Sequence, residues 1–419
     1  MHLYFLLIRI AALLGHQKAR KLVAGQRETL ERQSLPTDCI WIHAASVGEF
    51  EQARPLIERL RVTGYGLRVV VTFFSPSGYE ARKNYDKADA VLYLPFATRS
   101  NAKRFLDALQ PKMAIFVKYE FWPAYLEELH ARNIPTYSIS SIFRPEQLFF
   151  RWWGKRHLQA LNCFTHIYVQ DEASLQLLQT HGVMQASVAG DTRFDRVKQV
   201  MDEGLRVTGD RFAPIVEFVK SAERVLVAGS TWPEDEVLLT QYIEVTGDGL
   251  QVTGRTKLIL VPHEIDEKHL HTIFDLFKGR FVRYSEVTGD GLQVTDESQR
   301  NILQRAQVLV IDTIGLLSSI YRFGQVAYIG GGFGVGIHNT IEAAVYGVPV
   351  LFGPNYEHFR EAKGLIAAGA ARSIKDYNEL ETALETAFAQ HETIGAKAAD
   401  YVQSELGATA KIYAELFGN

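Results

Sequence analysis

The chain has 419 residues, a length that predicts two or three domains, and its 47% hydrophobic and 22% charged content is typical of a folded globular protein. A net charge of −3 argues against a nucleic-acid-binding protein, which normally carries a strong excess of basic residues. The two cysteines, Cys39 and Cys163, have no metal-ligand spacing, so they indicate a reducing compartment without a disulfide framework.

Residues 1–15 form an apolar segment that is interrupted by Arg9. The segment is too short to span a bilayer, and its basic residues follow it, whereas in a secretory signal they come first. An apolar segment followed by the basic residues Lys18, Arg20 and Lys21 is typical of a helix that lies on an anionic membrane surface. A buried N-terminal helix of a soluble protein is the alternative.

The first half of the chain alternates short apolar runs with helical patterns, which indicates a doubly wound parallel sheet. The runs that predict strands are residues 39–44, 69–74, 91–94, 113–117, 136–140, 167–169 and 186–189.

Polar residues follow three of these strands, at the sheet edge where open α/β folds bind ligands. Glu49, at a helix start after the first strand, can act as a general base toward an acceptor hydroxyl, or it merely complements the helix dipole. Glu120 lies beside Trp122 after residues 113–117, where it is either a pocket wall or a helix-start carboxylate. Arg144 can bind a carboxylate or a phosphate through two parallel hydrogen bonds.

Residues 149–156 combine four aromatic rings with three basic side chains. Such a cluster suits a bilayer interface or an anionic lipid head group, and interior packing of the rings is the alternative.

The second half repeats the alternation and predicts a second Rossmann-like domain, with the active site expected in the cleft between the two domains. Its strands are expected at residues 225–228, 258–261, 307–311, 326–329 and 348–352.

A glycine-rich turn, residues 330–336, follows the strand at 326–329 and precedes an expected helix that carries His338, Asn339 and Glu342. Free amides and the helix dipole favour an anion there, and Glu342 would face the same side as Asn339 and take ribose hydroxyls. An ordinary strand–helix connection with a satisfied carboxylate is the alternative.

Ser230 and Thr231 follow the strand at 225–228, where they are either phosphate donors or N-caps. Residues 244–253 recur unchanged as residues 286–295, with shorter relatives at 62–67 and 207–210. We interpret these four copies as inserted surface loops or turns without chemistry.

Six stretches together resemble a known family. They are HAASVGEFEQA at 43–53, TFFSPSGYE at 72–80, YEFWP at 119–123, AGST at 228–231, VLVIDTIG at 308–315 and GGGFGVGIHNTIEAAVYGVPVLFGP at 330–354. In this order the set resembles the 3-deoxy-D-manno-octulosonic acid (Kdo) transferases of lipopolysaccharide synthesis, glycosyltransferase family 30 of the GT-B superfamily.

The resemblance implies an α/β GT-B fold with two Rossmann-like, doubly wound domains that face each other across a cleft. It implies a membrane-associating apolar helix at 1–15, an acceptor-binding domain at 16–205, a CMP-sugar-binding domain at 206–395, and a C-terminal helix at 396–419 that packs back on the first domain.

The resemblance also implies an inverting transfer of Kdo from CMP-Kdo to a lipid A precursor, lipid IVA, at the cytoplasmic face of the bacterial inner membrane. No cofactor, metal or nucleic acid is expected. Glu49 matches the catalytic base. The matching acceptor-side residues are Ser46, Gly48, Glu120 and Arg144, and the donor-side residues are Ser230, Thr231, His263, Gly331, Gly332, His338, Asn339 and Glu342.

Two departures from the family pattern affect these expectations. Lys118 stands where many members carry an acidic residue, and the loop around His263 has fewer basic residues than is usual. The alternatives are another GT-B enzyme, either a UDP-sugar glycosyltransferase or a nucleotide-sugar epimerase, and a non-catalytic protein that binds lipid A at the membrane surface.

Overall fold

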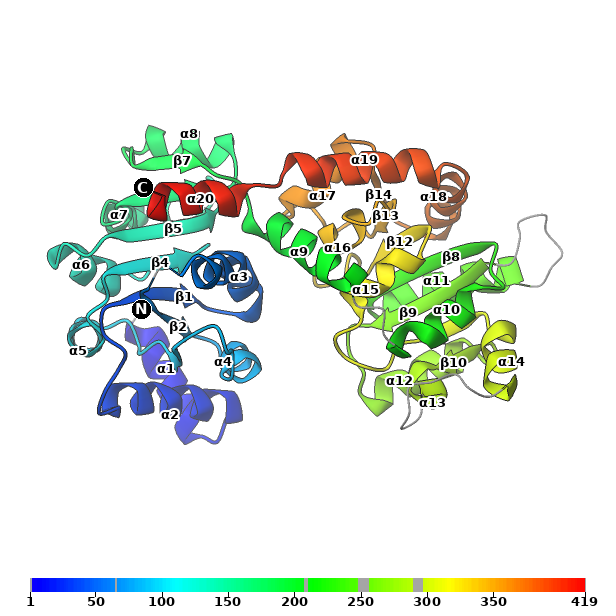
Figure 1. The fold of residues 1–419 in the computed structure, drawn as a ribbon, viewed down its shortest axis with the longest axis horizontal. Coiled ribbons are helices and arrows are strands. Elements are labelled where there is room, and N and C mark those ends of the chain that lie inside the picture. Colours follow the sequence, from blue (N-terminus) through cyan, green and yellow to red (C-terminus); the bar gives the residue numbers. More distant parts are fainter. Residues whose placement is uncertain (1, 65, 207–209, 248–255, 289–296, 419) are drawn as a thin grey trace. The chain divides into compact units, whose positions relative to one another are not determined.

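The computed structural model describes residues 2–64, 66–206, 210–247, 256–288 and 297–418. The chain divides into two compact units: unit 1 comprises Met1–Arg196 and Glu405–Asn419, and unit 2 comprises Val197–Ser404 (Figure 1). The domain boundary expected at 205/206 lies inside helix α9 (Thr192–Arg206), and the one expected at 395/396 lies inside α19 (His391–Ser404).

Unit 1 is built on a seven-stranded sheet of order β3-β2-β1-β4-β5-β6-β7, and all its pairings are parallel. Its strands are β1 (Cys39–Ala44), β2 (Arg68–Phe73), β3 (Ala90–Tyr93), β4 (Met113–Val117), β5 (Thr136–Ser141), β6 (His166–Val169) and β7 (Ala186–Val188). The seven strands predicted from apolar runs are therefore confirmed, because parallel strands covered on both faces are apolar throughout.

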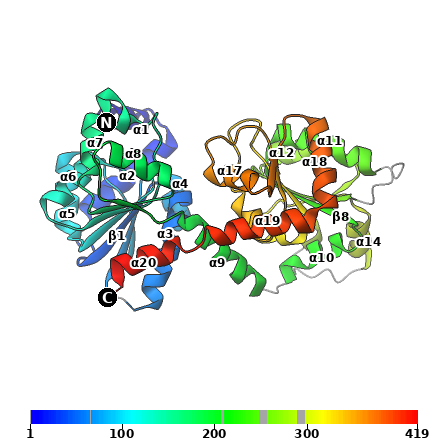
Figure 2. The same ribbon diagram turned by 90° about the horizontal axis from the view of Figure 1, so that it is seen from above.

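Helices cover both faces of this sheet (Figure 2). They are α1 (His2–Leu13), α2 (Gln17–Glu31), α3 (Val47–Val62), α4 (Pro76–Arg82), α5 (Arg99–Leu109), α6 (Pro123–Ala131), α7 (Lys155–Leu161), α8 (Glu172–Thr180) and α20 (Ala408–Phe417), with the short turns η1 (Leu148–Phe150) and η2 (Trp152–Gly154). On one face, Trp41 of β1 meets Phe105 and Phe116 edge to face, at centroid distances of 5.3 and 5.2 Å. On the other face, Ile412 of α20 belongs to the same core as Phe50 of α3.

Helix α1 buries Phe5, whose ring stacks on Phe96 at 4.7 Å. Its other large apolar side chains are mostly exposed, and they are Leu3, Tyr4, Leu6, Leu7, Ile10 and Leu13, followed by Leu14 just after the helix. Within the described residues, no helix has both the length and the apolarity needed to cross a bilayer. Membrane association of this helix stays a prediction.

The aromatic cluster at 149–156 separates into two parts. Phe149 and Phe150 are half-buried and pack against the core, whereas the Trp152 and Trp153 side chains are 88% and 58% exposed. Interior packing therefore holds for the two phenylalanines only.

Unit 2 contains a second seven-stranded parallel sheet, of order β10-β11-β9-β8-β12-β13-β14. Its strands are β8 (Arg224–Thr231), β9 (Thr256–Pro262), β10 (Phe281–Arg283), β11 (Val308–Val310), β12 (Val326–Ile329), β13 (Val350–Phe352) and β14 (Ala371–Ser373). The five predicted strands are confirmed. The edge strands β10 and β14 were not predicted because each has only three residues and neither forms a wholly buried apolar run.

The helices of unit 2 lie on both sides of its sheet (Figure 2). They are α10 (Ala213–Val219), α11 (Pro233–Gly247), α12 (Glu267–Leu276), α13 (Tyr284–Thr288), α14 (Glu297–Arg305), α15 (Leu317–Ile320), α16 (Ile341–Ala344), α17 (Arg360–Ala367), α18 (Tyr377–Ala389) and α19, with the turns η3 (Asp210–Phe212) and η4 (Tyr321–Phe323).

The two long repeated segments, residues 244–253 and 286–295, do not begin as the predicted surface loops or turns. Residues 244–247 end helix α11 and residues 286–288 end helix α13, so these parts are helical and are not turns. The remainder of both long copies, and parts of the two short ones, lie outside the described residues.

Candidate functional site

Glu49 lies in the first turn of α3, directly after β1. Its Oε2 accepts hydrogen bonds from the Ser46 amide at 2.9 Å and from the Ser46 hydroxyl at 3.2 Å. This arrangement is part of a capping box, so Glu49 does stabilise the start of α3, which is the alternative role considered for it. Within the described residues Oε1 has no protein partner, which leaves one oxygen for a substrate. Gly48 beside it is exposed, and a Cβ there would meet nothing nearer than the Ser46 hydroxyl at 4.0 Å.

The electrostatic surroundings of Glu49 make it a stronger base. Burial is the largest cause that raises the pKa of its carboxyl, and the negative charge of Glu120 is the next. The hydrogen bonds from Ser46 and the nearby His43 oppose this effect without cancelling it. A carboxylate with a raised pKa binds a proton more readily, as a general base requires.

Glu120 follows β4 and takes part in a network that sequence analysis did not find. Its Oε2 accepts from Trp122 Nε1 at 2.7 Å and lies 3.2 Å from Nε2 of His43. His43 belongs to β1 and is fully buried. The only sequence signal was a polar residue in an otherwise apolar strand.

Arg144 follows β5 and lies close to Tyr119, with Nη1 3.4 Å from the phenol oxygen. The Lys118 ammonium lies 5.4 Å from the centroid of the same ring. Lys118 has a left-handed φ of 63°, an uncommon conformation for a lysine at a strand end. The residues predicted at this edge, Ser46, Glu49, Glu120 and Arg144, thus all follow strands β1, β4 and β5.

In unit 2, Ser230 and Thr231 end β8 and differ in their surroundings. Ser230 has a left-handed φ of 54°, and its hydroxyl has no protein partner in the described part of the chain. The buried Thr231 hydroxyl donates to Glu236 at 2.9 Å, so it points into the interior. Neither side chain caps α11, which begins at Pro233.

A buried carboxylate holds the glycine-rich turn. Asp235 Oδ2 accepts from the Gly331 amide at 2.8 Å and from the Trp232 amide at 2.9 Å, while Oδ1 accepts from the Tyr328 hydroxyl at 2.7 Å. The Gly331 amide is therefore engaged within the protein. The Gly332 amide has no protein acceptor among the described residues.

The glycines of this turn are required by close backbone approach. A Cβ at Gly330 would lie 2.2 Å from the Ser230 carbonyl oxygen, and one at Gly332 would lie 2.6 Å from the Gly353 main chain. The turn is thus packed tightly against β8 and the end of β13.

Helix α16 begins only at Ile341 and is four residues long, so His338 and Asn339 precede it, contrary to the prediction. The reason is local, because Asn339 Oδ1 accepts from the Ile341 amide and forms a turn before the helix. Asn339 Nδ2 also donates to Glu342 Oε1 at 3.0 Å, so these two side chains do face the same side.

Three rings form a cluster near the glycine turn: Trp232, His263 and His338. The ring centroids of Trp232 and His263 are 4.8 Å apart, and those of His263 and His338 are 4.4 Å apart. Trp232 Nε1 donates to His338 Nε2 at 3.3 Å, which requires that nitrogen to be unprotonated. Burial and the neighbouring His263 lower the pKa of His338 to about 4, so its imidazole is neutral at pH 7. Trp232 was not predicted as part of the site.

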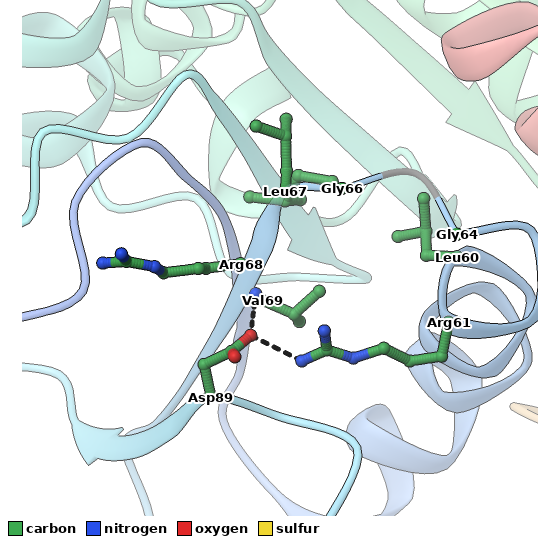
Figure 3. Close-up of a pocket in the computed structure, with 9 residues that line it drawn as sticks. Leu60, Arg61, Gly64, Gly66, Leu67, Arg68, Val69 and Asp89 are labelled. Atoms are coloured by element: carbon green, nitrogen blue, oxygen red, sulfur yellow. Dashed lines mark hydrogen bonds and ion pairs between the residues drawn. The ribbon is translucent and has the colours of Figure 1, made fainter.

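Within the described ranges, no group of three or more His, Cys, Asp or Glu side chains is arranged to hold a metal ion. A surface cavity of about 290 Å³ lies at the opposite edge of the unit 1 sheet, where β2 begins (Figure 3). It is lined by Leu60, Leu67 and Val69, and Asp89 pairs there with Arg61. This cavity is separate from the edge that carries Glu49.

Comparison with known proteins matches residues 16–196 to the family model described as 3-Deoxy-D-manno-octulosonic-acid transferase (kdotransferase). The 3-deoxy-D-manno-octulosonic acid transferase of Aquifex aeolicus is 26% identical over 349 residues, covering 82% of this chain and 84% of the relative. The enzyme of the same description from Haemophilus influenzae is 28% identical over 362 residues, covering 84% and 78%.

Solved structures agree on the fold. A UDP-GlcNAc 2-epimerase from Neisseria meningitidis superposes with a TM-score of 0.63 at 15% identity, covering 91% of this chain and all of that one. A glycosyltransferase from Rickettsia africae gives a TM-score of 0.57 at 11% identity, covering 91% and 99%. At these identities the likeness concerns the fold alone, which is GT-B-like with two parallel sheets.

Proposed function

We propose that the protein transfers Kdo from CMP-Kdo to a lipid A precursor such as lipid IVA. The match of residues 16–196 to the Kdo transferase family model and the 26–28% identity to Kdo transferases over most of the chain support the proposal. The observation that carries the proposal is Glu49, a half-buried carboxylate with a raised pKa, of which one oxygen has no partner among the residues that the structure describes.

In the proposed step, Glu49 takes the proton from a sugar hydroxyl of the acceptor. The hydroxyl oxygen then forms a bond to the anomeric carbon of Kdo, and the bond from that carbon to the phosphate oxygen of CMP breaks. CMP leaves with the bonding electron pair, and the configuration at the anomeric carbon inverts. The burial that raises the pKa of Glu49 favours the proton transfer.

Positive charge around Tyr119 supports an anionic acceptor. Arg144 and Lys118 both lie against Tyr119, one residue before Glu120. A guanidinium and an ammonium suit the phosphate or carboxylate groups of a lipid A precursor. Lys118 adds a positive charge where relatives often carry an acidic residue, so we propose that it strengthens this contact.

For the donor, unit 2 offers the Gly332 amide and the Ser230 hydroxyl, both without protein partners among the described residues. These groups suit the single phosphate of CMP, and the Glu342 carboxylate, oriented by Asn339, suits the ribose hydroxyls. We propose that the reaction uses no metal and no cofactor, because a CMP ester already has a good leaving group.

The exposed leucines of α1 support action at the cytoplasmic face of the inner membrane. Replacing Leu3 and Leu7 of α1, and Leu14 just after it, by Gln should lower the fraction that sediments with anionic vesicles. Replacing the exposed Val335 of unit 2 by Gln is the control. Equal sedimentation of both variants and the unaltered protein would rule out α1 as the contact.

The decisive assay incubates the purified protein with CMP-Kdo and a tetra-acylated lipid A precursor and reads the product masses. One or more added Kdo units with release of CMP are expected, and Glu49→Gln should abolish them. A parallel titration compares CMP with UDP. Tight binding of UDP and none of CMP would instead favour a UDP-sugar enzyme, and CMP-Kdo left unconsumed by the unaltered protein would overturn the proposal.

A further inference from the structure

A buried chain of hydrogen bonds runs across the unit 1 sheet and ends at Glu120. Trp41 Nε1 donates to Thr72 Oγ1 at 2.8 Å, and Thr72 Oγ1 lies 2.9 Å from Nδ1 of His43. Nε2 of His43 then lies 3.2 Å from Glu120 Oε2. Trp41, Thr72 and His43 are completely buried. A buried polar side chain is costly unless its hydrogen bonds are satisfied, so this chain has one favoured arrangement.

The directions of these bonds follow from the groups at the two ends. Because Glu120 Oε2 can only accept when ionised, Nε2 of His43 must carry the proton and donate it. Nδ1 then accepts from the Thr72 hydroxyl, which in turn accepts from Trp41. In this tautomer Nδ1 accepts from the Thr72 hydroxyl and does not bond to the Thr72 carbonyl oxygen, which lies 3.1 Å away. Trp122 Nε1 lies 3.3 Å from Nε2 and donates to Glu120 Oε2 at 2.7 Å. With the proton on Nδ1, the bare Nε2 would face the carboxylate oxygen.

Trp122 provides a second donor to the same oxygen, at 2.7 Å. Its indole is held from the other side by ring contacts with Phe5 of α1 and with Phe74. Glu120 Oε2 therefore receives two fixed donors, while no protein donor to Oε1 is present in the described part of the chain. The position of the carboxylate is set by these two bonds.

Glu120 acts on Glu49 through its charge. Of the charged and titratable groups that act on Glu49, Glu120 raises its pKa and His43 lowers it, while Ser46 acts through hydrogen bonds. The effect of a charge depends steeply on its distance at half-buried sites. A Glu120 side chain that is free to turn toward solvent would act on Glu49 less.

We propose that His43 is a positioning residue for the transfer reaction, an inference that rests on the proposed function. Its ring keeps the Glu120 carboxylate at the place where that carboxylate supports Glu49 as the proton acceptor. The bond that matters is the one from Nε2, and the bond at Nδ1 fixes the ring so that Nε2 can donate.

Two substitutions separate the nitrogens of His43. In His43→Gln the side-chain amide reaches the position of Nε2 and can still donate to Glu120. In His43→Asn the amide reaches only the position of Nδ1, so the bond to Thr72 is kept and the bond to Glu120 is lost. A purely structural role would make the two variants equally impaired, or Gln the worse because it is longer and more flexible.

The experiment measures kcat and kcat/KM for Kdo transfer against pH for the unaltered protein and both variants. With His43→Asn we expect kcat to fall about tenfold, because the lost hydrogen bond to a charged group no longer fixes the Glu120 carboxylate. Loss of His43 also removes a group that lowers the pKa of Glu49, but the charge of Glu120 has the larger effect. The acidic limb of the profile should therefore move to lower pH, while the KM for CMP-Kdo stays unchanged. His43→Gln should restore most of kcat and the position of the limb. His166→Asn, a histidine that contacts Ser187 on β7, is the matched control and should behave as the unaltered protein.

Thermal unfolding of each variant shows whether it is folded at the assay temperature. Trp122→Phe provides a second test that leaves residue 43 itself unaltered, although Trp122 Nε1 lies 3.3 Å from His43 Nε2. It removes the other donor to Glu120 Oε2 and should move the acidic limb in the same direction. An unmoved limb in both His43→Asn and Trp122→Phe, with folded proteins, would overturn the positioning role. Failure of the unaltered protein to transfer Kdo would instead overturn the proposed function.

Discussion

The two units share a seven-stranded parallel sheet, yet the edges that carry their candidate sites are built differently. In unit 1 the edge presents the charged side chains Glu49 and Glu120, held by donors from Ser46, His43 and Trp122. In unit 2 it presents main-chain groups, in a turn held by a buried carboxylate. Under the proposed function, one scaffold would thus serve proton transfer through side chains in unit 1 and anion binding through the backbone in unit 2. Side-chain changes in unit 1 should therefore affect rate, and backbone changes in unit 2 should affect donor affinity.

The largest effect is expected from Glu49→Gln. The amide keeps the size of the side chain but cannot take a proton, so kcat should fall by about 10²–10⁴-fold. The affinity for CMP, measured by titration calorimetry, should be unchanged because unit 2 is not altered. Glu80→Gln, at an exposed ion pair with Lys83 on α4, is the control and should retain full activity. A Glu49→Gln variant with normal kcat would show that Glu49 is not the base, and unit 1 would then not differ from unit 2 in supplying the proton acceptor.

Gly330→Ala should have the converse effect. The added Cβ would lie 2.2 Å from the Ser230 carbonyl oxygen and 2.6 Å from the Thr231 Cα, so the turn must shift. We expect about tenfold weaker CMP binding and a loss of about 1–3 kcal/mol of stability, measured by calorimetry and by urea unfolding. Gly334→Ala is the matched control, because nothing lies within 4 Å of a Cβ there. If both variants bound CMP equally well, the packed turn would not be part of the donor site.

A smaller effect concerns the pH dependence of unit 1. The raised pKa of Glu49 means that its active, unprotonated form is reached only above the usual range for glutamate, so kcat/KM should rise with pH there. Glu120→Gln removes a negative charge that raises this pKa, and the acidic limb should therefore move to lower pH. The pH profile of kcat/KM for the two proteins checks the shift. A limb that moved to higher pH would show that Glu120 does not act on Glu49 through its charge.

The smallest effect is expected at His338 and concerns stability. The folded protein binds the proton of His338 only near pH 4, whereas the unfolded chain binds it near pH 6.5. The contribution of the neutral ring is therefore complete above about pH 6.5 and is lost as the pH falls toward about 4. His338→Gln can still accept from Trp232 but does not titrate. Its stability relative to the unaltered protein should rise steadily as the pH falls from 7 to 4.5 in urea unfolding. A constant difference would contradict the lowered pKa.

Sequence patterns predicted the strands other than β10 and β14, and the placement of Glu49, Glu120 and Arg144 after strands, because apolar runs and the residues that follow them are local features. They missed what depends on partners far along the chain. His43 gains its role from Thr72 and Glu120, and Asp235 from Gly331, and no spacing rule connects such pairs. The late start of α16 was missed because a side-chain turn at Asn339 competes with the helix.

The return of the chain to unit 1 has a consequence for how the protein is made. Helix α20 places Ile412 in the core of unit 1, and Asp195 accepts from the Gly407 and Thr409 amides. During vectorial synthesis all of unit 2 leaves the ribosome before these residues do, so unit 2 can fold first while the core beneath α3 stays uncovered. A premature stop after Ser404 would spare unit 2 entirely and still expose apolar surface on the unit that carries Glu49. Until translation ends, unit 1 therefore exposes apolar surface that α20 covers in the finished chain, and exposed apolar surface of this kind promotes aggregation.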